Sequence, residues 1–256
     1  MMDRKEQILQ VARREGRVMV EDLALTFGVS AHTIRRDINT LCEEAKLRRL
    51  HGGAEYIEGQ ANLPYHARAV LNFDEKNAIA RAVARVIPDE ATVFISIGTT
   101  PAIVAGALAG KRALTVITNN LNAAFALSET AGNRIILPGG ELRLPDRDLL
   151  SPEAVELFST YRADFAIYGV GGIDSDGSLL DFHASEVQMR EQMRMNARRS
   201  ILVADRSKFG RRAAAVGGRL NEADMLVLDH APETTFTPLL DDYDGTLVLA
   251  METTDI

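Results

Sequence analysis

Hydrophobic residues in the first quarter of the chain recur at the spacing of short amphipathic helices. This period predicts helices over residues 3–14, 21–27 and 30–44. A short apolar stretch at residues 17–20 predicts an edge strand, and residues 47–56 predict a hairpin around a glycine pair. Together these elements predict a three-helix core whose hairpin pairs with the edge strand.

The third helix carries the clearest local signals. Ile34, Ile38 and Leu41 follow one another at helical spacing and form one apolar face. Gly28 stands where the preceding helix should end in a left-handed residue, and Ser30 stands at the N-cap of the third helix. The pattern therefore predicts two helices joined by a tight turn, the second packing one face on the core.

The opposite face of this helix is polar and basic. Such a helix suits the DNA major groove, where Arg and Asn read base edges and Thr meets a phosphate or a thymine methyl group. The alternative is an ordinary charged surface helix, but the basic hairpin that follows favours a winged helix-turn-helix. The residues expected to contact double-stranded DNA are Ser30, His32, Thr33, Arg35, Arg36 and Asn39, with Arg48, Arg49 and His51 in the hairpin, or wing.

Two motifs in this region resemble the signature of the DeoR family of bacterial repressors. They are Thr33-Ile34-Arg35-Arg36-Asp37 in the third helix and His51-Gly52-Gly53-Ala54 in the wing. The resemblance implies an operator-binding domain at this end of the chain. His32 departs from the family pattern, in which glutamine is common at this position, and this points to a different operator sequence.

From residue 74 onward, buried strands alternate with helices. This alternation predicts an α/β domain with a mostly parallel, doubly wound sheet. The expected strands cover residues 92–97, 114–118, 134–137, 164–168, 200–204, 225–228 and 246–249; the expected helices cover 74–87, 98–108, 151–160 and 186–198, with another beginning at 119–120.

Five consecutive strands of this domain end in small polar or glycine-rich loops. In an open parallel sheet these ends face one crevice, which is the usual ligand site. A helix start with free N–H groups and hydroxyls favours a phosphate, although each loop taken alone is as well explained as a tight turn. The expected ligand-binding residues are Gly98, Thr99, Thr100, Thr118, Asn119, Asn120, Gly139, Gly140, Gly171, Gly172, Asp174, Asp205 and Lys208.

Two further patterns look like metal sites at first reading. Asp174-Ser175-Asp176-Gly177 begins like a calcium loop but lacks the later ligands, so a hairpin turn is the better interpretation. His183 and Glu186 are three residues apart without a third ligand. We therefore predict no metal and no cofactor.

The resemblance to the DeoR family extends over these loops, from Ile97-Gly98-Thr99-Thr100-Pro101 to Asp205-Arg206-Ser207-Lys208. It implies an effector domain that resembles ribose-5-phosphate isomerase and glucosamine-6-phosphate deaminase in fold. It also implies a phosphorylated effector, glycerol 3-phosphate first. Ser96 and Ser151 depart from the pattern beside the expected crevice, where relatives often carry an acid or amide and usually a glycine, respectively.

Composition and charge fit a DNA-binding N-terminal region followed by an effector domain. The chain has 256 residues, one cysteine and a net charge of −7. Residues 1–54 hold ten basic and eight acidic side chains, so they are net positive while the remainder carries −9. The acidic remainder should repel DNA away from the recognition helix and wing. With one cysteine, no signal peptide and no apolar run of membrane-spanning length, we expect a cytoplasmic protein.

We therefore expect a winged helix-turn-helix over residues 1–57, an irregular polar linker over 58–73, and an effector and oligomerisation domain over 74–256. The leading function is a repressor of a carbohydrate or glycerol catabolic operon, acting as a homodimer or homotetramer, because one winged helix contacts few base pairs. The alternative is a phosphosugar isomerase or deaminase with an accessory DNA-binding domain. That enzyme needs a carboxylate base, for which Asp174, Asp181 and Asp205 are available.

Overall fold

The structure is a computed structural model that describes residues 3–15, 17–43, 46–50, 52–56, 65–144 and 146–252. It divides into two compact units, Met1–Leu71 and Asn72–Ile256. Each unit has its own hydrophobic core. Within the described residues, no helix is long and apolar enough to cross a membrane.

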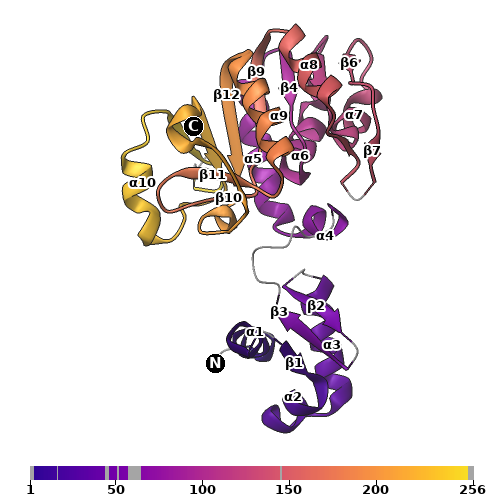
Figure 1. The fold of residues 1–256 in the computed structure, drawn as a ribbon, viewed down its shortest axis with the longest axis vertical. Coiled ribbons are helices and arrows are strands. Elements are labelled where there is room, and N and C mark those ends of the chain that lie inside the picture. Colours follow the sequence, from indigo (N-terminus) through magenta and orange to yellow (C-terminus); the bar gives the residue numbers. More distant parts are fainter. Residues whose placement is uncertain are drawn as a thin grey trace. The chain divides into compact units, whose positions relative to one another are not determined.

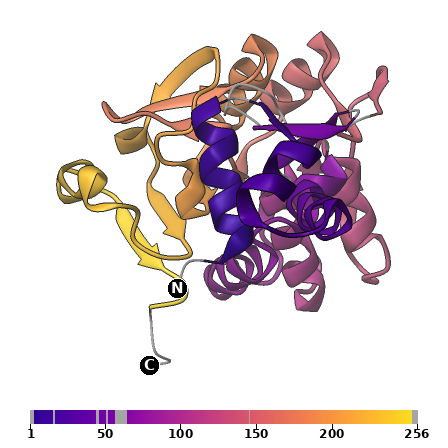
Figure 2. The same cartoon turned by 90° about the horizontal axis from the view of Figure 1, so that it is seen from below.

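The first unit is a winged helix-turn-helix, as predicted (Figure 1; the helices are also visible in Figure 2). Strand β1 pairs antiparallel with β3, and β3 pairs with β2, so the wing hairpin does join the predicted edge strand. The elements are α1 (Arg4–Glu15), β1 (Arg17–Met19), α2 (Val20–Phe27), α3 (Ala31–Glu43), β2 (Leu47–Leu50), β3 (Gly53–Tyr56) and α4 (Tyr65–Val70).

Close packing explains the glycine pair of the wing. A Cβ on Gly53 would lie 2.1 Å from the Val18 carbonyl oxygen, so only glycine lets β3 approach β1 this closely. Gly52 has a φ of 76°, which glycine adopts without strain. The core beneath is built from Ile8, Ile34 and Ile38, all fully buried.

The prediction of an irregular linker over residues 58–73 was wrong in its second half. Helix α4 covers Tyr65–Val70, and α5 begins at Phe73. The Leu71 N–H donates to the Ala67 carbonyl, which extends the end of α4. A helix of six residues is too short to display a 3.6-residue hydrophobic period, and none of its residues is fully buried. Residues 57–64 lie outside the described part of the chain.

The second unit is built on a parallel sheet with the strand order β15-β14-β12-β9-β4-β5-β6. This confirms the predicted α/β fold with a doubly wound sheet. The strand order switches between β4 and β9, since β5 and β6 continue on one side and β12, β14 and β15 on the other. The strands are β4 (Thr92–Ile95), β5 (Thr115–Thr118), β6 (Arg134–Ile136), β9 (Ala163–Tyr168), β12 (Ala197–Ala204), β14 (Met225–Leu228) and β15 (Thr246–Leu249). The helices are α5 (Phe73–Val86), α6 (Thr99–Ala107), α7 (Leu121–Ser128), α8 (Pro152–Thr160), α9 (Ala184–Met195) and α10 (Thr237–Asp241), with short 3-10 turns η1 (Leu108–Gly110), η2 (Arg206–Lys208), η3 (Leu220–Glu222) and η4 (Thr234–Phe236).

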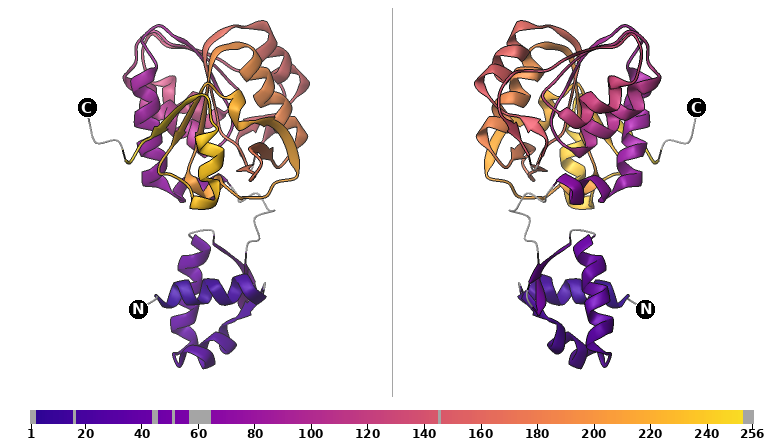
Figure 3. Two further views of the ribbon diagram at one scale, coloured as in Figure 1. Left: turned by 90° about the vertical axis from the view of Figure 1, so that its left-hand side faces the viewer. Right: turned by 90° about the vertical axis from the view of Figure 1, so that its right-hand side faces the viewer.

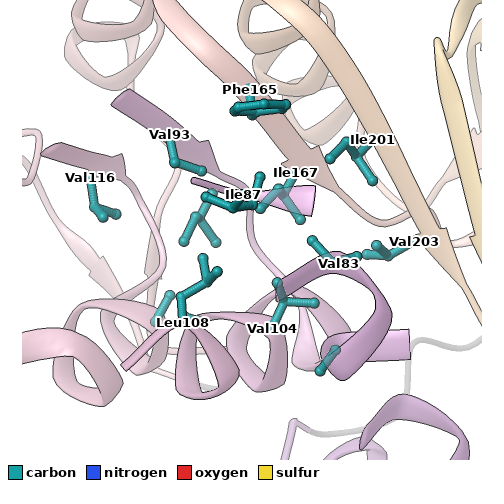
Figure 4. Close-up of a cluster of buried hydrophobic side chains, with 14 of the residues drawn as sticks. Val83, Ile87, Val93, Val104, Leu108, Val116, Phe165, Ile167, Ile201 and Val203 are labelled. Carbon is teal, nitrogen blue, oxygen red and sulfur yellow. The ribbon is translucent and has the colours of Figure 1, made fainter. Parts of the chain in front are cut away.

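Helices cover both faces of this sheet (Figure 3). Alternate strand residues point to opposite faces, so Val93 joins the core under α5, α6 and α7, whereas Phe94 joins the core under α8 and α9. Figure 4 shows the first of these cores, where Val83 and Val104 pack against strand residues. Both faces are covered, which explains why the strands read as nearly continuous apolar runs.

Apart from the hairpin turn at residues 174–177, the small antiparallel elements were not predicted from the sequence. A two-stranded hairpin, β7 (Leu142–Arg143) with β8 (Asp148–Leu149), follows β6, and a separate sheet joins β10 (Gly172–Ile173), β11 (Ser178–Asp181) and β13 (Ala215–Arg219). These strands have two to five residues, too few for a clear alternation. The predicted helix over residues 186–198 was also misplaced, because α9 ends at Met195 and β12 begins at Ala197.

Candidate nucleic-acid interface and ligand site

Local hydrogen bonds fix the start and orientation of α3. The Ser30 Oγ accepts a bond from the Thr33 N–H at 3.2 Å and lies 2.9 Å from the Thr33 hydroxyl, which confirms the N-cap. Gly28 ends α2 with a φ of 64°. Ile34 and Ile38 are fully buried, so the helix presents its opposite face outward. The exposed side chains on or beside that face are His32, Arg35, Arg36 and Asn39.

The basic side chains of this face have different partners. Arg35 donates to Glu21 of α2 at 3.2 Å. Arg49 of the wing donates to the Asn39 Oδ1 at 2.9 Å, which ties the wing to the recognition helix. Arg36 makes no ion pair with any described residue. The sequence predicts these side chains at the interface but not the bond that aligns Arg49 with Asn39.

Two predicted DNA contacts fall partly or wholly beyond the described structure. His51 lies outside the described residues, as does the side chain of Arg48, although the Arg48 backbone pairs with Glu55 in the wing. Asp37, the last residue of the α3 motif, has a structural partner instead. Its carboxylate accepts from Arg4 of α1, so it holds α1 against α3.

The switch in strand order between β4 and β9 brings two of the predicted loops together. The loop after β4 leads into α6 through Gly98, whose φ of 108° suits glycine alone. The loop after β9 contains Gly169, where a Cβ would lie 3.6 Å from the Pro101 ring. Thr99 and Thr100 therefore start a helix at the point where ligands bind in open α/β sheets, with first-turn N–H groups that lack helical acceptors.

Thr118 and Asn120 are buried and support this loop from within. The Thr118 hydroxyl donates to the Ile95 carbonyl at 2.6 Å. The Asn120 Nδ2 donates to the Ser96 and Gly98 carbonyls, while its Oδ1 accepts from N–H groups at the start of α7. Asn120 is thus both the N-cap of α7 and a brace for the β4–α6 loop.

Asn119, at the carboxyl end of β5, connects this edge of the sheet to the β7–β8 hairpin. Its Nδ2 donates to the Leu149 carbonyl at 2.9 Å, and its buried Oδ1 has no partner among the described residues. Gly140, with a φ of 124°, follows β6 beside Ser151. Ser151 caps α8 by accepting from the Ala154 N–H at 3.3 Å, which gives its departure from the family pattern a structural role.

Gly171 and Gly172 allow close packing of backbone on backbone. A Cβ on Gly172 would lie 1.9 Å from the Arg211 carbonyl oxygen. The Gly171 N–H donates to the Asp181 carboxylate at 2.8 Å, and Arg190 donates to the other oxygen of that group at 3.1 Å. Burial raises the pKa of Asp181 to about 6, although Arg190 and the Gly171 N–H act in the opposite direction.

The predicted hairpin turn after β10 is confirmed, because the Gly177 N–H donates to the Asp174 carbonyl between β10 and β11. Asp174 is exposed, and its carboxylate accepts from Ser175. Asp205 is buried at the end of β12, where its Oδ1 accepts from Ser207 and Asn72. Lys208 lies at the end of the same turn, η2.

A charged cluster at this edge was not predicted from the sequence. Arg143 of β7 makes a bidentate pair with Asp148, at 2.8 Å for each bond, and also donates to Glu186 at 2.9 Å. Glu186 further accepts from the His183 N–H at the start of α9, so the pair that resembled a partial metal site is a helix cap. No group of three or more possible metal ligands occurs in the described part of the chain.

The arrangement suits binding of a small anion better than proton transfer from carbon. Helices α6, α7 and α8 all begin at this edge of the sheet, and helix starts favour negative charge. The three carboxylates available to an isomerase, Asp174, Asp181 and Asp205, already accept hydrogen bonds from the protein. These bonds give each carboxylate a structural partner: Asp181 is held between Gly171 and Arg190, Asp205 between Ser207 and Asn72, and Asp174 lies in an exposed turn.

Comparison with known proteins agrees with a DNA-binding first unit followed by a separate second domain. Residues 4–60 match the model of the DeoR-like helix-turn-helix domain, and residues 71–230 match that of the DeoR C terminal sensor domain. The chain is 42% identical over 240 residues to the glycerol-3-phosphate regulon repressor of Escherichia coli (strain K12), covering 94% of this chain and 95% of the relative. It is 40% identical to the repressor of the same name from Haemophilus influenzae, with 90% of each chain covered. A solved structure of ribose 5-phosphate isomerase A from Methanocaldococcus jannaschii is 15% identical, with a TM-score of 0.40 over 55% of this chain and 56% of the other.

Proposed function

The chain belongs to the DeoR family of transcriptional repressors, and we propose that it represses a glycerol or carbohydrate catabolic operon until a phosphorylated metabolite, glycerol 3-phosphate first, releases it. The winged helix holds the operator, and the second unit binds the effector. The observation that carries this proposal is the basic face of α3, anchored by buried isoleucines, in a chain similar to glycerol-3-phosphate regulon repressors over nearly its whole length.

On the DNA side, Arg36 and His32 are proposed to read base edges in the major groove. Arg49 and Arg48 of the wing are proposed to contact phosphates. The bond between Arg49 and Asn39 supports this division, because it fixes the wing relative to the recognition helix before DNA binds. The proposed contact set is completed by Ser30, Thr33, Arg35, Asn39 and His51.

On the effector side, the phosphate is proposed to lie at the start of α6, against the N–H groups of Gly98, Thr99 and Thr100, with Lys208 as the cation. Gly139 and Gly140 bring backbone to the same edge, and Asp174 and Asp205 supply acceptors for hydroxyls. Thr118, Asn119 and Asn120 are given a supporting role, since their buried side chains bond to neighbouring backbone. Gly171 and Gly172 hold the facing loop.

We further propose that the repressor acts as a homodimer or homotetramer that presents two recognition helices to a two-fold operator. One winged helix reads only a few base pairs, and symmetry matched to half-sites supplies the missing specificity. Sedimentation of the purified chain with and without operator duplex measures this. A monomer that binds the operator tightly would contradict it.

Operator affinity measured by fluorescence anisotropy tests the proposal, using a duplex that the protein itself selects from a random-sequence pool. Glycerol 3-phosphate should weaken binding by roughly 5- to 150-fold, the usual range of allosteric coupling. Glycerol and inorganic phosphate serve as separate controls for the two halves of the ligand. Unchanged affinity at millimolar glycerol 3-phosphate would remove this effector.

Two variants assign the effect to the proposed site. Lys208→Ala and Thr99→Val should keep operator affinity while losing the response to glycerol 3-phosphate. Lys111→Ala, which removes a lysine that precedes β5 at the opposite end of the sheet, should respond like the parent. If product forms from phosphosugars at enzyme-like rates in NMR spectra of the same samples, the isomerase alternative replaces this proposal.

A further inference from the structure

Asn72 has an unusual conformation at the boundary between the two units. It is the first residue of the second unit, directly after Leu71 of the unit that carries the winged helix. Its φ of 52° and ψ of 43° place it in the left-handed region. Asparagine is one of the few residues besides glycine that adopt this conformation. It therefore sets the direction in which the chain enters α5.

The side chain of Asn72 does not cap the helix that it precedes. An asparagine at this position usually accepts from an N–H of the first helical turn, but no such bond forms at the start of α5. Its Nδ2 instead donates to the Asp205 Oδ1 at 3.0 Å and to the Ser207 Oγ at 3.3 Å, across 133 and 135 residues of sequence. The start of α5 is thus fastened to the turn that follows β12.

Asp205 is well suited to hold this bond as a charged group. It is only 2% exposed, and its Oδ1 also accepts from the Ser207 N–H and hydroxyl. Burial acts to raise the pKa of Asp205, but Lys208 and Lys76, with hydrogen bonds from Ser207 and Asn72, lower it below the usual value. Lys76 is itself buried and lies one turn into α5. The helix that Asn72 precedes therefore also acts on this carboxylate through the charge of Lys76.

The geometry points to Asn72 as the positioning residue that reports effector binding to the segment leading to the winged helix. This inference rests on the proposed function, in which the effector contacts Asp205 and Lys208 of this turn. A ligand hydroxyl that donates to Asp205 competes with the Asn72 amide, and a phosphate that draws Lys208 changes the charge around the same carboxylate. When the amide bond changes, the left-handed turn at Asn72 is no longer held in place, and the path from Leu71 into α5 changes.

Coupling requires that the ligand act differently on two arrangements of one element. The Asn72–Asp205 bond is such an element, because one end is in the proposed effector turn and the other is at the unit boundary. Its removal should therefore uncouple the two binding events without abolishing either. A residue needed only for folding would instead weaken both.

Two variants of Asn72 separate these roles. Asn72→Gly removes the amide and keeps the left-handed turn without strain. Asn72→Asp keeps both the shape and the tolerance for this conformation but replaces the donor with a carboxylate beside Asp205. Asn77→Ala is the matched control, since the Asn77 Nδ2 donates to the Phe73 carbonyl of its own helix. Urea denaturation of all four proteins establishes that each is folded.

Each folded protein is then characterised by its two affinities and by the coupling between them. Calorimetric titration gives glycerol 3-phosphate affinity, and anisotropy gives operator affinity with and without saturating glycerol 3-phosphate. In the parent and Asn77→Ala, the ligand should weaken operator binding by the same factor. In both Asn72 variants this factor should fall to about one. In Asn72→Gly, which adds no charge, the separate affinities for ligand and operator should stay within about fivefold of the parent.

The possible failures are distinguishable. If the Asn72 variants retain the full parental factor, the inference is overturned and the repressor function stands. If Asn72→Gly loses affinity for ligand or operator alone by more than about tenfold, Asn72 belongs to a binding site or to the fold, and the coupling role is overturned. If the parent binds the operator but shows no response to glycerol 3-phosphate, the proposed effector fails, and this inference fails with it.

Discussion

Replacing Arg36 by alanine is the sharpest test of the recognition helix. Arg36 is exposed on α3, one residue from the pair formed by Arg35 and Glu21, and makes no ion pair with described residues. Its guanidinium can therefore meet DNA without first breaking an ion pair within the described structure. If it is bidentate to a guanine, its loss should cost about 1–3 kcal/mol at each half-site, or roughly 5- to 150-fold in affinity.

Arg35 provides the internal comparison. Turning Arg35 toward DNA sacrifices an exposed ion pair with Glu21, and such pairs are worth about 0.2–1 kcal/mol. The net loss for Arg35→Ala should be smaller than for Arg36→Ala by up to that amount. In a two-fold complex each loss occurs twice, so the difference between the variants should be easily measured.

Fluorescence anisotropy at about 50 and 200 mM salt distinguishes base recognition from phosphate binding. Arg36→Ala should weaken the selected operator much more than unrelated DNA and leave the salt dependence nearly unchanged. Arg49→Ala should weaken all sequences alike and reduce the slope of log affinity against log salt by about one for each phosphate that the variant no longer neutralises. Arg14→Ala, an exposed change on α1, serves as the charge control.

Two outcomes would refute this assignment of α3. If Arg36→Ala binds operator and unrelated DNA within about twofold of the parent, α3 does not present this face to the bases. Equal losses for Arg36→Ala and Arg14→Ala would show that only net charge matters.

Three further predictions concern the second unit. Asn120→Ala should lower the free energy of unfolding in urea by about 2–4 kcal/mol, because it removes a helix cap and takes the Asn120 donor from the buried Ser96 carbonyl; a loss below about 1 kcal/mol would contradict the bracing role. Because burial raises the pKa of Asp181 to about 6, the folded state holds this proton more tightly than the unfolded chain, so this group's contribution is fully present below about pH 4 and is lost as pH rises through 6. The unfolding free energy of the parent minus that of Asp181→Asn should therefore fall by up to about 3 kcal/mol as pH rises from about 4 to above 6. A rise in this quantity would contradict the raised pKa. Gly172→Ala should destabilise by about 2–5 kcal/mol in thermal or urea unfolding, because its Cβ would overlap the Arg211 carbonyl oxygen; near-parental stability would mean that this backbone yields.

Much of the first unit could be predicted because its signals are local. Gly28, Ser30 and the spacing of Ile34, Ile38 and Leu41 specify a helix end, a helix start and a buried face within fourteen residues. Each signal depends only on near neighbours along the chain. The alternation of buried strands and helices in the second unit is similarly readable, because each element is long enough to show its own period.

The roles of individual residues at the sheet edge depended on which segments meet. Asn119 and Asn120 look like ligand contacts in sequence, because they follow a strand and open a helix. In the structure their amides donate to backbone carbonyls of neighbouring segments, at Leu149 of β8 and at Ser96 and Gly98 after β4. The strand order, with β5 beside β4, brings the Ser96 and Gly98 carbonyls within reach.

The linker and its bond to Asp205 show the same limit most clearly. A six-residue helix and a left-handed asparagine leave no periodic trace in sequence, and the partner of Asn72 lies 133 residues away. Propensity and hydrophobic period are properties of neighbouring residues, so the sequence by itself determined the main elements, their order and the class of each domain. Hydrogen bonds between distant segments depend on how the packed layers align those segments, so tertiary structure alone decided which side chains brace the loops and which join the turn after β12 to the unit boundary.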